Sequence, residues 1–325
     1  MSEQKSRRYL VTGATGYIGG HLAALLVERG HQVRALARNP DKLSDAPWRG
    51  GAEVVRGDLG DPDSLTAAFT DVDVIYYLVH SMGSSSDFVS EEERSARNVA
   101  RAAETAGVRR IVYLSGLHPQ GELSRHLRSR MAVGEILMKS GVEALVLQAG
   151  IVVGSGSASF EMIRHLTDRL PVMTTPKWVR NEIQPIAIDD VLHYLVEAGH
   201  APLRESRTFD VGCDDVLEYG TAMQVYAEES GLRRRVIVAL PLLTPSIASW
   251  WVGLVTPIPL GLARPLVESL EHDAVRSEHD IDAVIPPPPG GLTSYREAVS
   301  RALKHDGTAG RGRRQLIRFS SAVPQ

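Results

Sequence analysis

The stretch from Tyr9 to Leu22 constrains the fold of this chain more than any other, because glycines interrupt it at regular spacing. A short apolar run ends at Val11, and Gly13, Gly16 and Gly19 follow before a helical pattern begins. A strand, a tight turn and a helix N-terminus in this order direct backbone N–H groups at an anion. The spacing predicts a turn that binds the pyrophosphate of a dinucleotide, and a purely structural turn is the alternative.

Strands and helices alternate after this turn. Apolar runs predict further strands at 32–37, 53–56, 72–79, 110–114 and 144–149, with helical patterns between them. This alternation predicts an α/β fold, in which a Rossmann-type doubly wound parallel sheet occupies residues 1–150. A smaller C-terminal substrate-side lobe is expected over 151–306, including a strand at 207–211, and a flexible basic tail over 307–325.

Arg38 follows the second predicted strand, where a side chain faces the adenosine ribose of a bound dinucleotide. An acidic residue there accepts hydrogen bonds from a free 2′-hydroxyl, whereas a cation accommodates a 2′-phosphate. No acid adjoins Arg38, so the sequence favours NADP as cofactor, with NAD as the other possibility. The alternative for Arg38 is a solvated strand end.

Composition excludes several other classes of protein. A formal charge of −3 over 325 residues gives no electrostatic reason to expect nucleic acid as a partner. The single cysteine, Cys213, excludes an internal disulfide and reads as a buried apolar residue. The histidines are scattered without ligand spacing, so no metal site is expected. The charged N-terminus runs directly into the first strand, which predicts a cytoplasmic protein without a signal peptide.

The segment Val236–Ala263 contains no charged residue and includes Trp250 and Trp251. A membrane-spanning helix needs about 20 mostly apolar residues, and four prolines interrupt this segment. We therefore expect a packed lobe or a cover for an apolar substrate rather than a transmembrane span. Contact with a membrane surface is the intermediate alternative.

Several motifs together resemble a known family. They are Thr12–Gly19, Gly57–Leu59, Tyr113–Gly116 and Gln184–Asp190. They are similar to motifs of the short-chain dehydrogenase/reductase superfamily, specifically its atypical extended, NAD(P)H-binding branch. Four further stretches resemble a bacterial group of nucleoside-diphosphate-sugar epimerase-like proteins: Tyr77–Gly83, His126–Arg130, Gly154–Phe160 and Leu170–Met173. Longer members of this group carry a C-terminal extension that is similar to Trp251–Pro257. The resemblance covers roughly residues 9–211.

The resemblance implies cofactor contacts at positions distributed over four strand ends. The glycine turn would line the phosphates, and Arg38 would contact the adenosine ribose. The end of the third predicted strand would contact the adenine, and the end of the fourth would contact the ribose next to the nicotinamide. The residues of the turn are Gly13, Thr15, Gly16, Tyr17, Ile18 and Gly19; those of the other two ends are Asp58 and Leu59, then Leu78, Val79, His80 and Ser81.

The catalytic positions depart from the family pattern. Ser115 matches the serine that polarises a substrate carbonyl, while a hydroxyl that only satisfies backbone groups is the alternative. Active members carry a tyrosine four residues before a lysine, and here His126 and Arg130 occupy those places. Histidine transfers protons near neutral pH, and arginine supplies only a constant positive charge. These two residues are therefore either a substitute pair or part of a basic surface.

Three functions follow from these expectations. The first is an NADP(H)-dependent oxidoreductase that reduces a carbonyl, quinone or activated double bond of an apolar small molecule. The second is a non-catalytic NADP(H)-binding redox sensor, since the tyrosine and lysine are absent. The third is an NAD(P)-dependent epimerase or isomerase.

Overall fold

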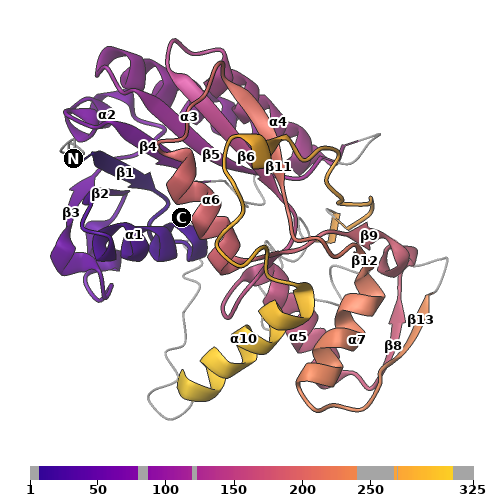
Figure 1. Cartoon of the computed structure of the whole chain (residues 1–325). Coiled ribbons are helices and arrows are strands. Elements are labelled where there is room, and N and C mark those ends of the chain that lie inside the picture. The colour runs from indigo at the N-terminus through magenta and orange to yellow at the C-terminus, as the bar shows by residue number, and fades with distance from the viewer. Residues whose placement is uncertain (1–6, 80–86, 119–122, 240–266, 269, 310–325) are drawn as a thin grey trace.

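A parallel sheet of seven strands forms the centre of the protein (Figure 1). The computed structural model describes all residues except 1–6, 80–86, 119–122, 240–266, 269 and 310–325. The sheet order is β11-β6-β5-β4-β1-β2-β3. The bounds are β1 (Arg8–Thr12), β2 (Gln32–Ala37), β3 (Ala52–Arg56), β4 (Val74–Tyr77), β5 (Arg110–Gly116), β6 (Glu143–Ala149) and β11 (Arg207–Val211). The predicted Rossmann-type, doubly wound sheet is confirmed, and the chain order reverses between β1 and β4, where such sheets bind ligands.

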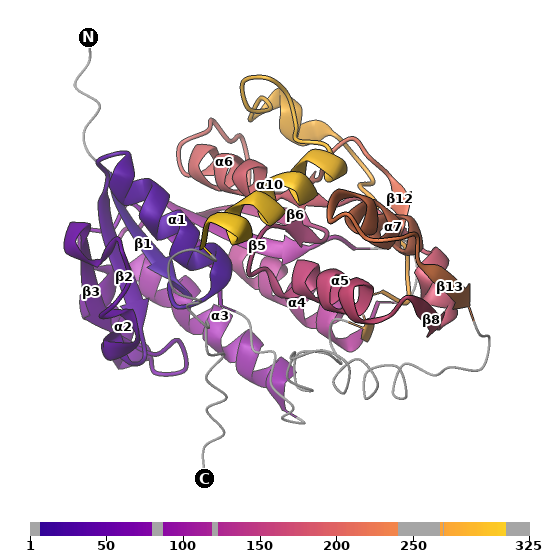
Figure 2. The same ribbon diagram turned by 90° about the horizontal axis from the view of Figure 1, so that it is seen from below.

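Helices cover both faces of the sheet (Figure 2). One face packs on α1 (Tyr17–Glu28) and α6 (Ile188–Ala198); the other packs on α2 (Pro62–Phe69), α3 (Phe88–Thr105) and α4 (Arg125–Met138). Leu10 and Val11 are adjacent in β1, and both are fully buried in opposite cores. Burial on both faces explains why these strands are continuous apolar runs in the sequence.

The strand β11 belongs to the central sheet, so its expected place in the substrate-side lobe is wrong. It pairs in parallel with β6, with Asp210 opposite Gln148. The helix α6, which precedes β11, contributes Leu192 and Leu195 to the core that α1 shares. The chain therefore leaves the sheet after residue 150 and returns to it. Local sequence cannot indicate this return, because pairing with β6 depends on residues about 60 positions away.

A second core lies among the segments that were predicted to form a substrate-side lobe. It contains α5 (Ala158–Arg169), α7 (Tyr219–Glu229) and α10 (Tyr295–Ala309), and Phe160, Tyr226 and Tyr295 are buried between them. The remaining short elements are β7 (Val152–Val153), β8 (Val172–Thr175), β9 (Glu182–Ile183), β10 (Ile186–Ala187), β12 (Leu217–Glu218), β13 (Val236–Ala239), and the 3-10 helices η1 (Pro40–Leu43), η2 (Arg49–Gly51), η3 (Lys177–Arg180) and η4 (Asp280–Ala283). The helix α10 continues three residues into the predicted tail, and residues 310–325 lie outside the described residues.

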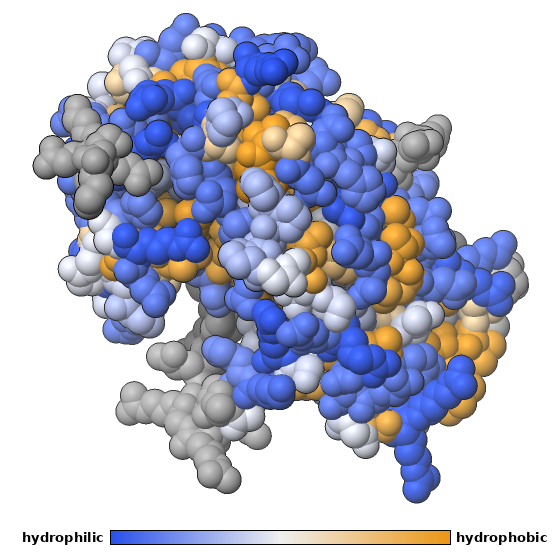
Figure 3. All heavy atoms as spheres, in the orientation of Figure 1, coloured by the Kyte–Doolittle hydropathy of each residue, from blue (hydrophilic) through white to orange (hydrophobic). Residues whose placement is uncertain are grey.

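The two-stranded sheet of β8 and β13 exposes apolar side chains at the edge of the lobe. Val172, Val236 and Val238 are exposed, and Figure 3 shows hydrophobic surface on the side where these strands lie in Figure 1. Most of the uncharged segment predicted as a substrate cover, residues 240–263, lies outside the described residues. Among the helices that are described, none combines the length and the hydrophobicity needed to cross a bilayer.

Cys213 lies just after β11 and is 1% exposed, as expected for a buried apolar residue. Burial raises the pKa of its thiol to about 11. Since the thiolate is the reactive form, we expect a disulfide reagent at pH 8 to label the native protein about 100-fold more slowly than the urea-unfolded chain. A time course of thiol labelling under both conditions measures this ratio. Equal rates would contradict the buried position.

Candidate active site

The glycine turn lies against the end of β4. Gly13 has a φ of +70°, and a Cβ atom there would lie 2.7 Å from the carbonyl oxygen of Leu78. A Cβ atom on Gly19 would lie 2.3 Å from the carbonyl oxygen of Gly13. The Thr12 hydroxyl donates to the carbonyl oxygen of Tyr76 and accepts from the amide of Leu78, both at 3.0 Å. The turn, the helix and two strand ends are thus packed closely through backbone atoms.

The N-terminus of α1 is open to an anion. Its N-cap is Gly16, no side chain caps it, and its first turn contains no acidic residue. Thr15 and Gly16 are exposed at this end, and Tyr17 and Ile18 are half-buried. The first amides of a helix have no partner within the helix, and the helix dipole favours negative charge there. The residues of the turn therefore fit a pyrophosphate.

Arg34 in β2 and Arg38 just after β2 have different surroundings. Arg34 is 8% exposed and donates to Glu53 at 2.7 Å and to the carbonyl oxygens of Ala68 and Thr70 at 2.7 and 2.8 Å. Its guanidinium therefore has a structural role. Arg38 is exposed just beyond β2, and its guanidinium has no hydrogen bond or ion pair with the rest of the described chain. Of these two arginines, Arg38 is thus the one whose guanidinium is available to a 2′-phosphate.

The loop after β3 is held by one of its own side chains and by a side chain of α3. The Asp58 carboxylate accepts a hydrogen bond from the Gly60 amide at 2.9 Å. The Asn98 side chain of α3 donates to the carbonyl oxygen of Leu59 at 2.9 Å, and the Leu59 side chain is buried. This holds the loop beside the crevice, where an adenine was predicted to lie.

The end of β4 supplies the edge predicted to face the nicotinamide ribose. Leu78 and Val79 are half-buried, and both lie beside Gly13. The structure thus brings these two residues to the glycine turn. His80 and Ser81 were predicted to continue this edge, and they lie outside the described residues.

Ser115 occupies the carboxyl end of β5. It is 2% exposed, and the neighbouring Tyr113 side chain interacts with its hydroxyl, but no hydrogen bond of ordinary geometry satisfies this hydroxyl among the described residues. Tyr113, two residues earlier, is a core residue: its ring meets Tyr77 edge-on at 5.5 Å, and its hydroxyl donates to the carbonyl oxygen of Arg130. Burial raises the pKa of Tyr113, so its phenol stays protonated at neutral pH.

His126 and Arg130 lie one turn apart on α4 but have different environments. The ring of His126 stacks on Phe88 of α3, with centroids 4.5 Å apart. The guanidinium of Arg130 reaches the end of β5, where it donates to the carbonyl oxygen of Leu114 at 3.3 Å. The Nε atom of Arg130 is buried and has no partner in the described part of the chain. The structure therefore brings Arg130 to the strand end that carries Ser115, and it places His126 against α3.

The sequence alone did not single out two candidate functional residues, His118 and Gln148. The Gln148 side chain of β6 contacts Nδ1 of His118 at 2.6 Å, while Nε2 of His118 is buried without a partner among the described residues. Burial lowers the pKa of His118, and the positive charge of Arg130 lowers it further, against a smaller opposing effect of Asp210. The place of His118 in the sequence could have marked it as a candidate, because it follows Ser115 by three residues and lies just after the predicted strand.

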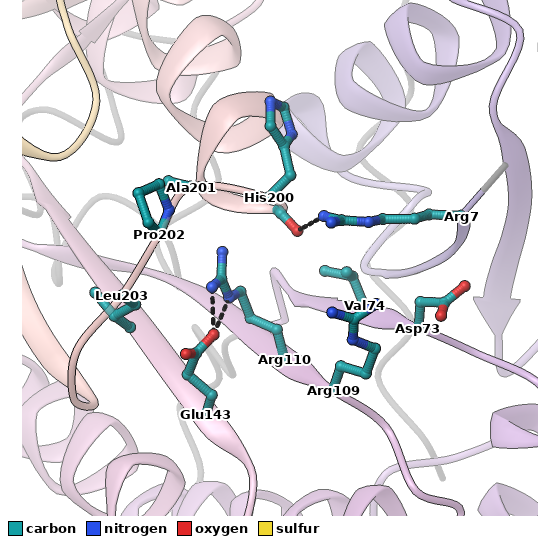
Figure 4. Close-up of a pocket in the computed structure, with 11 residues that line it drawn as sticks. Arg7, Asp73, Val74, Arg109, Arg110, Glu143, His200, Ala201, Pro202 and Leu203 are labelled. Atoms are coloured by element: carbon teal, nitrogen blue, oxygen red, sulfur yellow. Dashed lines mark hydrogen bonds and ion pairs between the residues drawn. The ribbon is translucent and has the colours of Figure 1, made fainter. Parts of the chain in front are cut away.

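A cavity of about 410 Å³ lies at the opposite edge of the sheet (Figure 4). Arg110 donates there to Glu143 at 2.5 Å and to the carbonyl oxygen of Ala198 at 2.6 Å, and Arg7 donates to that of Gly199 at 2.9 Å. These arginines satisfy the C-terminal carbonyls of α6, which is a structural role.

The described residues also contain no cluster of three or more histidine, cysteine or acidic side chains placed to hold a metal ion.

Comparison with known proteins agrees with this geometry. Residues 13–155 match the model of a family described as NAD(P)H-binding. The 3β-hydroxysteroid dehydrogenase/Δ5→4-isomerase of Mycobacterium tuberculosis is 36% identical over 118 residues, which are 33% of this chain and 31% of that protein. The chain thus spans about a third of the length of the first curated relatives that it matches.

Solved structures share the fold over nearly the whole chain. The triphenylmethane reductase of Citrobacter sp., solved with NADP(H), superposes with a TM-score of 0.70 at 21% identity and covers 90% of this chain and 99% of its own. An NADPH-dependent quinone oxidoreductase of Escherichia coli gives a TM-score of 0.70 at 21% identity and covers 91% and 99%. These likenesses confirm the fold, and the family match confirms the resemblance to NAD(P)H-binding proteins. The match to a family described as NAD(P)H-binding thus covers residues 13–155, and the central sheet has the strand order of a Rossmann-type fold.

Proposed function

We propose that the protein is an NADP(H)-dependent oxidoreductase that reduces a carbonyl, quinone or activated double bond of an apolar small molecule. One observation carries the proposal. The buried Ser115 hydroxyl makes no hydrogen bond of ordinary geometry among the described residues, and it lies at the carboxyl edge of the sheet, to which the glycine turn also belongs. A buried donor without a partner costs free energy, so its retention favours a ligand atom as the partner.

The roles of the chain's own residues follow from this placement. NADPH, when bound, supplies the hydride. The turn around Gly13 and Gly19 would hold the phosphates, and Arg38 would hold the 2′-phosphate. Ser115 donates a hydrogen bond to the acceptor oxygen of the substrate. The Arg130 charge, at the end of β5, stabilises negative charge that develops on this oxygen.

Two features support an apolar substrate. Val172, Val236 and Val238 form an exposed apolar edge of the lobe, and the uncharged sequence of Val236–Ala263 begins at the same strand. Relatives of similar sequence or fold are named for a hydroxysteroid, a triphenylmethane and a quinone. All three are largely apolar ring compounds, which is consistent with a lipophilic substrate for this chain.

The test replaces Ser115 with alanine in the full-length protein. We expect kcat with menadione or an aromatic aldehyde to fall about 10- to 100-fold, because one hydrogen bond to the reacting oxygen is lost. The dissociation constant for NADPH should change by no more than about twofold, since Ser115 would contact the substrate. Loss of NADPH absorbance measures turnover, and fluorescence titration measures binding.

The control is Thr167→Val in α5. Thr167 is fully buried and its hydroxyl also lacks a partner among the described residues, but it belongs to the core of the lobe. Its loss should leave turnover unchanged. A wild-type protein that binds NADPH and reduces none of the probes would instead support a non-catalytic NADP(H)-binding redox sensor. Turnover of Ser115→Ala at the wild-type rate would exclude the role given to Ser115.

A further inference from the structure

A row of polar residues crosses three strands at the carboxyl edge of the sheet. Ser115 of β5 lies opposite Gln148 of β6, which lies opposite Asp210 of β11. Residues paired in register point to the same face of a sheet. All three are buried, with exposed fractions of 2%, 9% and 5%. Polar residues in register across three buried strand ends indicate a site rather than a core.

Asp210 and Gln148 are held within this row. The Asp210 carboxylate accepts hydrogen bonds from the amide and the hydroxyl of Ser277, both at 2.8 Å. The Gln148 side-chain nitrogen lies 2.6 Å from Nδ1 of His118. With the amide nitrogen facing the ring, Nδ1 accepts the hydrogen bond and the ring proton resides on Nε2. The Nε2–H group is therefore a buried donor that has no acceptor among the described residues.

The surroundings keep this ring neutral. Burial and the positive charge of Arg130 lower the pKa of His118, and Asp210 opposes them only in part. A neutral imidazole with its proton on Nε2 donates a strong hydrogen bond without carrying a charge. Ser115 Oγ and Arg130 Nε are the other buried donors without described partners at this strand end. Three such donors at one strand end match the requirements of a site for a developing negative charge on oxygen.

We propose that His118 is a catalytic residue that donates a hydrogen bond from Nε2 to the acceptor oxygen of the substrate, and that Gln148 is a positioning residue that maintains the required tautomer. The proposal rests on the reductase function proposed above and assigns to His118 the role of hydrogen-bond donor to the acceptor oxygen. As the acceptor carbon receives the hydride, the electron pair of its carbonyl bond moves to oxygen. His118 and Ser115 stabilise the oxyanion, and water supplies the proton that completes the alcohol or hydroquinone.

The first test compares His118→Leu and His118→Gln in the full chain with NADPH and menadione. Leucine removes the donor, so we expect kcat to fall about 100-fold, with the dissociation constant for NADPH unchanged within about twofold. The side-chain amide of glutamine can place a nitrogen near the position of Nε2, so His118→Gln should recover much of the loss. The matched control is His31→Leu. His31 is also half-buried with a lowered pKa, but it packs on Tyr9 away from the site.

The second test does not depend on turnover. Nitrogen-15 NMR of the histidine rings should show Nε2 protonated and Nδ1 unprotonated for His118 at neutral pH, assigned by loss of its signals in His118→Gln. Gln148→Met removes the amide and should yield a mixture of tautomers and a lower kcat. A proton on Nδ1 in the wild type, or full activity of His118→Leu, would overturn the role of His118. Wild-type protein that reduces no probe would instead overturn the proposed reductase function.

Discussion

Gly19→Ala is expected to abolish NADPH binding and to destabilise the fold. The added Cβ atom would lie 2.3 Å from the carbonyl oxygen and 2.7 Å from the carbonyl carbon of Gly13. Both neighbours are backbone atoms in the turn that approaches the phosphates, so no side chain can move aside. Overpacking of this kind typically costs about 1–3 kcal/mol, and the displaced turn should weaken NADPH binding by more than about 100-fold.

Gly20→Ala is a stringent control for this prediction. Gly20 is the next residue of α1, and its added Cβ atom would lie 3.4 Å from the carbonyl oxygen of Ala14, an ordinary contact distance. Alanine is favoured over glycine inside a helix by about 1 kcal/mol, so this variant should be at least as stable as the wild type. Urea denaturation and NADPH titration of both variants measure the difference. Binding by Gly19→Ala within about threefold of the wild type would contradict the assigned role of the turn.

The central sheet was predictable because its strands are buried on both faces. Six apolar runs, from Tyr9–Val11 to Ala144–Ala149, became the strands β1 to β6 with small shifts of their ends. The strand β11 has the sequence Arg-Thr-Phe-Asp-Val and lies at the edge of the sheet. Its mixed pattern is compatible with any half-buried strand, so only the long-range pairing with β6 reveals its place.

The cofactor side of the site was more predictable than the substrate side. Gly13, Gly16 and Gly19 lie in one local motif, and backbone geometry alone explains their spacing. The row that includes Gln148 and Asp210 is assembled from three strands and cannot be found by local spacing. These positions look like ordinary polar residues in the sequence until the register aligns them with Ser115.

Arg38→Ala is expected to remove the preference for NADPH over NADH. Arg38 is exposed just beyond β2 and has no partner among the described residues, whereas Arg34 of the same strand is already bound to Glu53. A charge-assisted hydrogen bond to a phosphate contributes about 1.5–3 kcal/mol, which corresponds to a loss of about 10- to 100-fold in NADPH affinity. Binding of NADH should be unaffected, because NADH has no 2′-phosphate.

The matched control is Arg29→Ala, which removes an exposed arginine at the C-terminal end of α1, at the edge of the sheet remote from the turn. Calorimetric titrations of both variants with NADPH and NADH give four affinities, and only that of Arg38→Ala for NADPH should change. Increasing salt should also weaken NADPH binding to the wild type more than binding to Arg38→Ala, since ionic strength screens an exposed charge pair. Equal losses of NADPH and NADH affinity in Arg38→Ala would mean that Arg38 supports the local structure after β2 and does not recognise a phosphate. The proposed role of Arg38 in a preference for NADP would then be wrong.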